Sequence, residues 1–155
     1  MPFKVFISAS VRDEAIVEEL KSTLQKYGIT ATSINEMPLN INIEQYLRNQ
    51  IIVSDCFLAI IGTNMGQSRN VDFEMGMAAS LNKPIVPIVE EGAEIPKNIV
   101  NRGYILLDKN NPRLSYERAA EYLSQLKLEQ EKRNSIGGLV LLGLGILLLG
   151  ALASD

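Results

Sequence analysis

Short apolar runs alternate with amphipathic segments along most of this chain, and this alternation constrains its fold more than any other feature. Five apolar runs are predicted to be strands, at residues 4–8, 29–34, 56–61, 84–89 and 104–107. Helices are predicted to open at Ser10 and to run over 43–53, 70–81 and 112–132, with a brief helical turn at 95–101. Such alternation favours a parallel sheet with helices on both faces. We therefore expect an α/β fold of the flavodoxin-like type, with strand order 2-1-3-4-5 and ligands at the carboxyl ends of the strands.

Side-chain spacing adds detail to two of these elements. In the first helix the predicted apolar face is made by Ile16, Leu20, Leu24 and Tyr27, and Gly28 is expected to end the helix. The third strand, at 56–61, reads CFLAII without a polar break. A strand of this kind is expected to be buried on both faces of a parallel sheet.

The segment from Ile136 to Ala153 differs from the rest of the chain because none of its eighteen residues is charged. A helix of this length rises roughly 27 Å, close to the hydrocarbon thickness of a bilayer. It is also too apolar on every side for the surface helix of a small domain. A buried core helix or an aggregation-prone tail is the alternative. The length rule favours a single C-terminal transmembrane helix.

These patterns predict three parts: an α/β domain at residues 1–126, a charged juxtamembrane segment at 127–135 that is the end of the last helix or a linker, and a transmembrane helix at 136–153. Lys127, Lys132 and Arg133 precede the apolar span, which places the N-terminal domain in the cytoplasm as part of a single-pass membrane protein. Glu129 and Glu131 interrupt this basic cluster, which argues against specific recognition of anionic lipids.

The composition excludes several kinds of site. Fifteen basic and eighteen acidic residues give a formal net charge of -3, without the basic block that a nucleic-acid binder needs. Histidine is absent, which removes serine–histidine pairs and imidazole metal ligands. Cys56 is the only cysteine, so neither a disulfide framework nor a cysteine-rich zinc site is expected. We expect no metal and no cofactor, and chemistry that uses carboxylates, hydroxyls, amides and backbone donors.

Three common sites of the flavodoxin-like topology are also missing. The chain has neither the GxxxxGK[ST] phosphate loop nor GxGxxG after the first strand. A receiver domain would need an acidic pair after the first strand and an aspartate at the end of the third. The sequence has SAS at 8–10 and GTN at 62–64 instead.

Glu74 is the side chain that remains as a candidate for chemistry. On a helical wheel of residues 70–82 it falls in the same sector as Val71, Met75, Ala78 and their apolar neighbours. A carboxylate among apolar side chains is costly unless it meets a partner or a ligand, and desolvation there raises its pKa. The alternative is structural, because a negative charge near the start of a helix complements the helix dipole.

Four segments together resemble a TIR (Toll/interleukin-1 receptor) domain: KVFISAS at 4–10, the loop at 35–42, IIVSDCFLAIIG at 51–62 and VDFEMGMAASLNKPIVPIVE at 71–90. The resemblance covers roughly residues 3–126 and implies the five-stranded flavodoxin-like fold. In catalytic TIR domains, including those of bacterial and archaeal anti-phage systems, a glutamate on the third helix cleaves the nicotinamide–ribose bond of NAD. Glu74 occupies the matching place.

The resemblance also implies a substrate pocket around Glu74. Its residues would be Ala9 and Ser10 beside the nucleotide, Asn35 and Glu36 in a loop over the site or against an adjacent subunit, and Asn64 and Asn70 at the rim. Each has a simpler reading as a helix cap, a turn residue or a solvated charge. The sequence departs from many active members at Asn70, because they carry an aromatic residue four positions before the glutamate.

A single carboxylate is enough for the reaction that the resemblance implies. An ordinary glycosidase uses two carboxyl groups, one of which protonates the departing oxygen. Nicotinamide leaves a pyridinium as a neutral molecule and needs no proton. Glu74 would then stabilise the oxocarbenium-like transition state or attack the anomeric carbon. Capture of the sugar by water, or by a hydroxyl or ring nitrogen of the same nucleotide, leaves both hydrolysis and cyclisation open.

Three classes of function follow. The first is a membrane-anchored NAD glycohydrolase or cyclase, a defence or signalling effector activated by self-association as a homo-oligomer. The second is a TIR adaptor without enzymatic activity that signals through TIR–TIR contacts. The third is an enzyme similar to the nucleoside deoxyribosyltransferases, which also use a glutamate but would consume a deoxynucleoside and ignore NAD.

Overall fold

The strands of this protein form one parallel sheet. A computed structural model describes residues 2–9, 14–33, 40–63, 69–95 and 103–135. The strands are β1 (Phe3–Ala9), β2 (Ile29–Ser33), β3 (Cys56–Ile61), β4 (Ile85–Glu90) and β5 (Ile105–Leu107). Their order is β2-β1-β3-β4-β5, and every neighbouring pair is parallel. The predicted strand order is confirmed.

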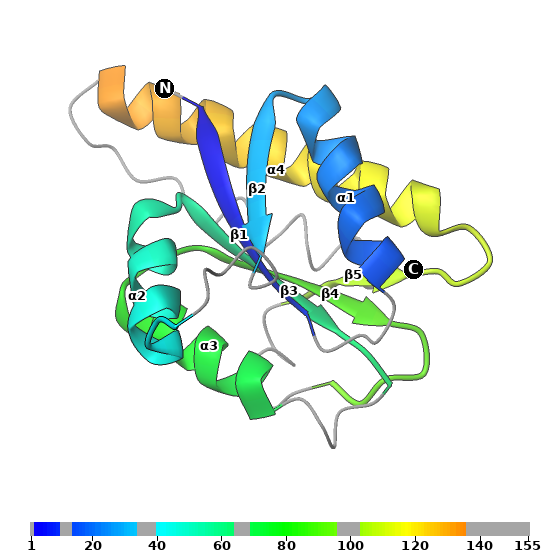
Figure 1. Ribbon diagram of the computed structural model, residues 1–155. Coiled ribbons are helices and arrows are strands. Elements are labelled where there is room, and N and C mark those ends of the chain that lie inside the picture. Colours follow the sequence, from blue (N-terminus) through cyan, green and yellow to red (C-terminus); the bar gives the residue numbers. More distant parts are fainter. Residues whose placement is uncertain (1, 10–13, 34–39, 64–68, 96–102, 136–155) are drawn as a thin grey trace.

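Four described helices cover the two faces of this sheet (Figure 1). They are α1 (Glu14–Lys26), α2 (Ile43–Val53), α3 (Arg69–Ser80) and α4 (Pro112–Ser135). The α1 and α4 helices pack together on one face, and α2 and α3 pack on the other. Because every neighbouring pair of strands is parallel, all strand carboxyl ends lie on one side of the sheet, here called the carboxyl edge. The strand starts define the amino edge.

The core consists of two apolar layers, one on each side of the sheet. Along β1, Val5 and Ile7 pack toward α1 and α4, whereas Phe6 packs toward α2 and α3. Phe6 stacks on Phe57 of β3, with ring centroids 6.2 Å apart. Every residue of β3 is buried, as its unbroken apolar sequence predicts.

Sequence spacing located most of the elements and mistook one helix face. Val17 is buried in α1 with Leu20 and Leu24, whereas Ile16 is only partly buried and Tyr27 is 38% exposed. The reason is that α1 ends at Lys26, so Tyr27 belongs to the following turn, which Gly28 completes with φ of +74°. The predicted start at Ser10 and most of the predicted turn at 95–101 lie outside the described residues.

The predicted membrane anchor also lies outside the described residues. Among the helices that the structure describes, none combines the length and apolarity needed to cross a bilayer. The longest of them, α4, has 24 residues and carries charged side chains along its length. The span at 136–153 therefore stays a prediction from the sequence.

Candidate functional site

The candidate site is built around Glu74 on α3. This helix lies over β1, β3 and β4, so one of its faces is turned to the sheet. Val71, Met75 and Ala78 are buried on that face, and Glu74 is buried among them with 3% of its surface exposed. The burial predicted from the helical wheel is confirmed. A carboxylate in this position needs a polar partner within the core.

Ser8 is that partner. It is the second-last residue of β1, and the alternation of side chains along a strand turns it to the same face as Phe6, toward α3. The Ser8 hydroxyl donates a hydrogen bond to Oε2 of Glu74, and Ser8 itself is only 2% exposed. The sequence analysis missed Ser8 as a site residue. Its two-residue offset from the buried Phe6 was the signal that could have identified it.

Burial and this hydrogen bond act in opposite directions on the Glu74 carboxyl group. Desolvation by burial is the larger effect and raises its pKa above the ordinary value of 4.5. The hydrogen bond from Ser8 favours the ionised form and lowers the pKa in part. The result is a carboxyl group poised to interact strongly with a positive charge brought next to it, because few water molecules screen it.

The position of this pair within the sheet matches the place where such folds bind ligands. The strand order reverses between β1 and β3, and Ser8 and Ala9 are in register with Ala59 and Ile60 near the ends of those strands. In open α/β sheets the crevice at such a reversal, outside the carboxyl ends, is the usual binding position. Glu74 and Ser8 therefore lie at the topological switch point.

A polar network fixes the neighbouring strand ends. The Thr63 hydroxyl, just after β3, donates a hydrogen bond to Oε1 of Glu90 at 3.2 Å. Lys109, just after β5, forms an ion pair with the same oxygen at 3.3 Å. These contacts link the ends of β3, β4 and β5 beside the switch point.

The structure describes only part of the predicted pocket. Ala9 follows Ser8 directly and is half-buried at the end of β1, so it lies at the switch point with Glu74. Ser10, Asn35, Glu36 and Asn64 lie outside the described residues, and for Asn70 only the position in the first turn of α3 is described. Their predicted contacts with a substrate stay predictions.

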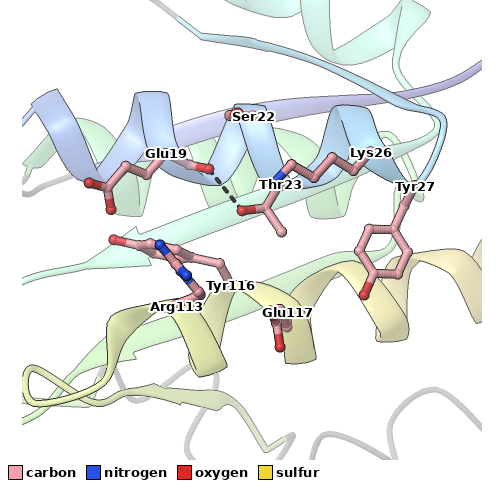
Figure 2. A pocket seen from close by; sticks show the side chains of 8 residues that line it. All are labelled: Glu19, Ser22, Thr23, Lys26, Tyr27, Arg113, Tyr116 and Glu117. Carbon is pink, nitrogen blue, oxygen red and sulfur yellow. Dashed lines mark hydrogen bonds between the residues drawn. The ribbon is translucent and has the colours of Figure 1, made fainter.

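A groove of about 460 Å³ lies in the other helical layer, between α1 and α4 (Figure 2). The residues around it are Glu19, Ser22, Thr23, Lys26, Tyr27, Arg113, Tyr116 and Glu117. The Thr23 hydroxyl is used within the helix, where it donates to the Glu19 carbonyl at 3.0 Å. Because α1 and α4 cover the face of the sheet opposite α3, this groove is separate from the Glu74 site.

Two further observations concern other chemistry. Among the described residues, no group of three or more cysteine, aspartate and glutamate side chains could hold a metal ion. Cys56 is fully buried in β3, and this burial raises the pKa of its thiol. A protonated, inaccessible thiol is a poor nucleophile.

Strand order, switch point and buried carboxylate define a flavodoxin-like α/β domain with a single-carboxylate site. The family model described as "TIR domain" matches residues 5–124. The chain therefore belongs to the TIR domain family, as its motifs indicated. No curated protein sequence matches it.

Several solved structures share this fold. The TIR domain of the Toll-related receptor TRR-2 from Hydra magnipapillata has a TM-score of 0.66 and 16% identity, with 78% of this chain and 97% of that chain covered. The TIR domains of the activated Roq1 resistosome, which recognises the effector XopQ, have a TM-score of 0.51 and 15% identity, with 98% and 84% covered. The CMP N-glycosidase BcmB of Clostridium botulinum has a TM-score of 0.53 and 20% identity, with 72% and 95% covered.

Proposed function

We propose that this protein is a membrane-anchored TIR enzyme that cleaves NAD and releases nicotinamide, as a glycohydrolase or a cyclase. The observation that carries the proposal is the Glu74–Ser8 pair. A carboxylate is buried at the topological switch point of a TIR domain and is held by one hydroxyl donor. Burying a carboxylate in an apolar core lowers stability, and one hydroxyl donor offsets this cost only in part, so a functional reason for the burial is expected. Binding a cation is a purpose that suits this environment.

The chemistry of NAD meets this requirement. Its nicotinamide ring carries a positive charge, and positive charge develops on the ribose as the glycosidic bond breaks. A desolvated carboxylate stabilises that developing charge more strongly than a hydrated one does. The Ser8 hydrogen bond holds Oε2, so Oε1 is the oxygen directed to stabilise or attack the anomeric carbon. Nicotinamide leaves as a neutral molecule, so the reaction needs no general acid to protonate it. A chain without histidine can therefore carry out this step.

The other parts of the proposal rest on sequence. Residues 136–153 anchor the domain in a membrane, with the α/β domain in the cytoplasm, and no metal or cofactor takes part. Self-association completes the site through the loop that contains Glu36. Defence or signalling is the corresponding cellular role.

The adaptor function is the second candidate. The TIR domain of TRR-2, which has a TM-score of 0.66, belongs to a receptor. An adaptor of this kind would signal by TIR–TIR contact alone. The buried Glu74 favours the enzyme, because an adaptor gains nothing from a desolvated carboxylate in its core.

Incubation of the detergent-solubilised full-length protein with NAD tests the proposal. We expect chromatography to show free nicotinamide together with ADP-ribose or a cyclised product. Clustered protein should be used as well as dilute protein, since the activity is expected to rise more than linearly with density on a membrane. Well-folded, clustered protein that leaves NAD intact would favour the adaptor, and cleavage of a deoxynucleoside instead would favour a transferase.

Deletion of residues 135–155 tests the anchor. We expect the truncated protein to move from the membrane fraction to the soluble fraction and to self-associate less, because the apolar span is lost. Fractionation and light scattering measure the two effects. Release of the full-length chain by high salt alone would contradict the anchor, since salt removes only electrostatically bound proteins.

A further inference from the structure

The last turns of α4 are fixed at the amino edge of the sheet. The Gln130 side chain donates a hydrogen bond to Oδ1 of Asp55 at 2.8 Å, just before β3. The other oxygen of Asp55 accepts from the backbone N–H of Lys4 in β1 at 2.8 Å. Lys127 Nζ lies 3.5 Å from the position that a Cβ atom would take at Gly28, which stands just before β2. The segment that leads into residues 136–153 therefore leaves the domain at the edge opposite Glu74 (Figure 1).

Charge is distributed unequally between the two edges. At the amino edge, the described side chains with a formal charge are basic at Lys4, Lys26, Lys83, Lys127, Lys132 and Arg133 and acidic at Asp55, Glu129 and Glu131. At the carboxyl edge they are acidic at the buried Glu74 and at Glu14, Glu44, Glu90, Glu91, Glu94 and Asp108, and basic at Lys109 and Arg113. A chain with net negative charge thus presents a positive surface at one edge.

Exposed apolar side chains accompany the basic residues at the amino edge. Ile52 and Val53 at the end of α2 are 46% and 56% exposed, and Leu128 on α4 is 55% exposed. Tyr27, in the turn after α1, is 38% exposed. Basic side chains mixed with exposed aliphatic and aromatic ones are typical of surfaces that lie on a bilayer of anionic lipids.

We propose that the amino edge of the sheet docks on the anionic surface of the membrane and directs the Glu74 site away from the bilayer. The docking surface consists of Lys4, Lys26, Tyr27, Ile52, Val53, Lys83, Leu128 and Lys132. The occupant is a phospholipid surface because the apolar span predicted from the sequence begins directly after α4, at this edge. The basic cluster on α4 is interrupted by acidic residues, but the fold adds lysines from β1, α1 and the α3–β4 turn.

This docking rests on the membrane anchor in the proposed function and is independent of NAD cleavage. An anchor alone tethers the domain and leaves it free to tumble. Electrostatic and apolar contacts at one edge select one orientation, in which the carboxyl edge stays open to substrate and to neighbouring molecules. Each lysine close to an anionic surface changes the ratio of docked to undocked protein by about fivefold.

Energy transfer between the full-length protein and labelled lipid headgroups tests the orientation. Thr30→Cys places a dye at the amino edge, since Thr30 is exposed and in register with Lys4, and Asn110→Cys places one at the carboxyl edge. The buried Cys56 stays unlabelled. In vesicles of phosphatidylcholine with about a quarter phosphatidylserine, we expect much stronger transfer from residue 30 than from residue 110. The difference should narrow in phosphatidylcholine alone.

Charge reversal provides the matched control. Lys26→Glu with Lys132→Glu should lower transfer from the residue 30 dye in anionic vesicles, whereas Lys109→Glu with Arg113→Glu, both exposed at the carboxyl edge, should leave it unchanged. Equal transfer from both positions, or an equal loss in both double variants, would overturn the proposal. Transfer between labelled copies at residue 30 without transfer to lipid would assign the surface to a second copy and also overturn it.

The same samples separate this proposal from the proposed function. Release of the chain by alkaline carbonate would overturn the anchor and the docking with it. Retention in the membrane with equal transfer from both dyes would overturn the docking alone. The expected transfer pattern without nicotinamide release would support the docking and contradict the enzymatic function.

Discussion

Two carboxylates at opposite edges of the sheet accept hydrogen bonds, and their donors differ. Asp55, at the amino edge, has both oxygens bonded to N–H groups, one from the Lys4 backbone and one from the Gln130 side chain. Glu74, at the carboxyl edge, is more deeply buried and has one hydroxyl donor, Ser8. The two hydrogen bonds of Asp55 thus connect β1 and α4 to the start of β3. Among the residues that the structure describes, no N–H group donates to the other oxygen of Glu74, and this difference separates a structural carboxylate from a candidate catalytic one.

Replacement of Glu74 by Gln should have the largest effect on activity. Glutamine keeps the shape and can still accept the Ser8 hydrogen bond, but it lacks the charge that a developing ribosyl cation requires. We expect nicotinamide release to fall by on the order of a hundredfold, with little change in NAD binding. Nicotinamide release and equilibrium NAD binding, measured on the same preparation, separate these effects.

The control for this variant is Glu91→Gln, which makes the same change at an exposed position on the carboxyl edge. Its activity should match that of the unaltered protein. Full NAD cleavage by well-folded Glu74→Gln would show that Glu74 is a second structural carboxylate, and the contrast with Asp55 would then disappear.

Replacement of Glu74 by Gln should also change how the stability of the protein depends on pH. Burial raises the pKa of Glu74 in the folded protein above its ordinary value of 4.5, so the unfolded chain binds fewer protons at this group. The free energy of unfolding of the unaltered protein should therefore decrease as the pH rises from about 4.5, the ordinary pKa of Glu74, through its raised pKa in the folded protein. Glu74→Gln should lack this decrease and unfold at equal or higher temperature near neutral pH. Thermal unfolding between acidic and neutral pH measures the difference.

Replacement of Ser8 by Ala should have the next largest effect. It removes the hydrogen bond that favours the ionised carboxylate, and a hydrogen bond to a charged group contributes about 1.5–3 kcal/mol. We expect kcat to fall by roughly tenfold or more. Because the pKa of Glu74 then rises further, the acid limb of the pH–rate profile should move to higher pH. A lower kcat with an unmoved acid limb would contradict the role of Ser8 in tuning Glu74.

The sequence predicted the fold well because the signals are local. The unbroken apolar run of β3 and the start and end of α2 were predicted to the residue, and Gly28 ends α1 as expected. The mistaken placement of Tyr27 in the apolar face of α1 has a local cause as well, because the helix ends at Lys26, one residue before Tyr27.

The candidate site was only half predictable, because one of its partners is distant in sequence. The burial of Glu74 follows from the spacing of apolar residues along α3. The alternation along β1 turns Ser8 to the same face as Phe6, but it does not specify a contact with Glu74, which is 66 positions away. The link between Asp55 and Gln130, 75 positions apart, was missed for the same reason. Sheet order brings such pairs together, and side-chain geometry decides whether they bond.

Replacement of Asp55 by Asn should have the smallest effect and should act on stability alone. The amide keeps one acceptor oxygen but presents an N–H₂ group to a second donor, so one of its two hydrogen bonds is lost. We expect a decrease of about 1–2 kcal/mol in the free energy of unfolding. Backbone amides near the end of α4 should also exchange faster, because Gln130 no longer fixes that turn to the sheet. Denaturant unfolding in nonionic detergent and hydrogen exchange measure the two effects, with Glu121→Gln, exposed on the same helix, as the control.

Nicotinamide release per folded molecule should stay unchanged in Asp55→Asn, because Asp55 lies at the edge opposite Glu74. A specific loss of activity in Asp55→Asn would show that the two edges are coupled and that the separation between a structural and a catalytic carboxylate is wrong.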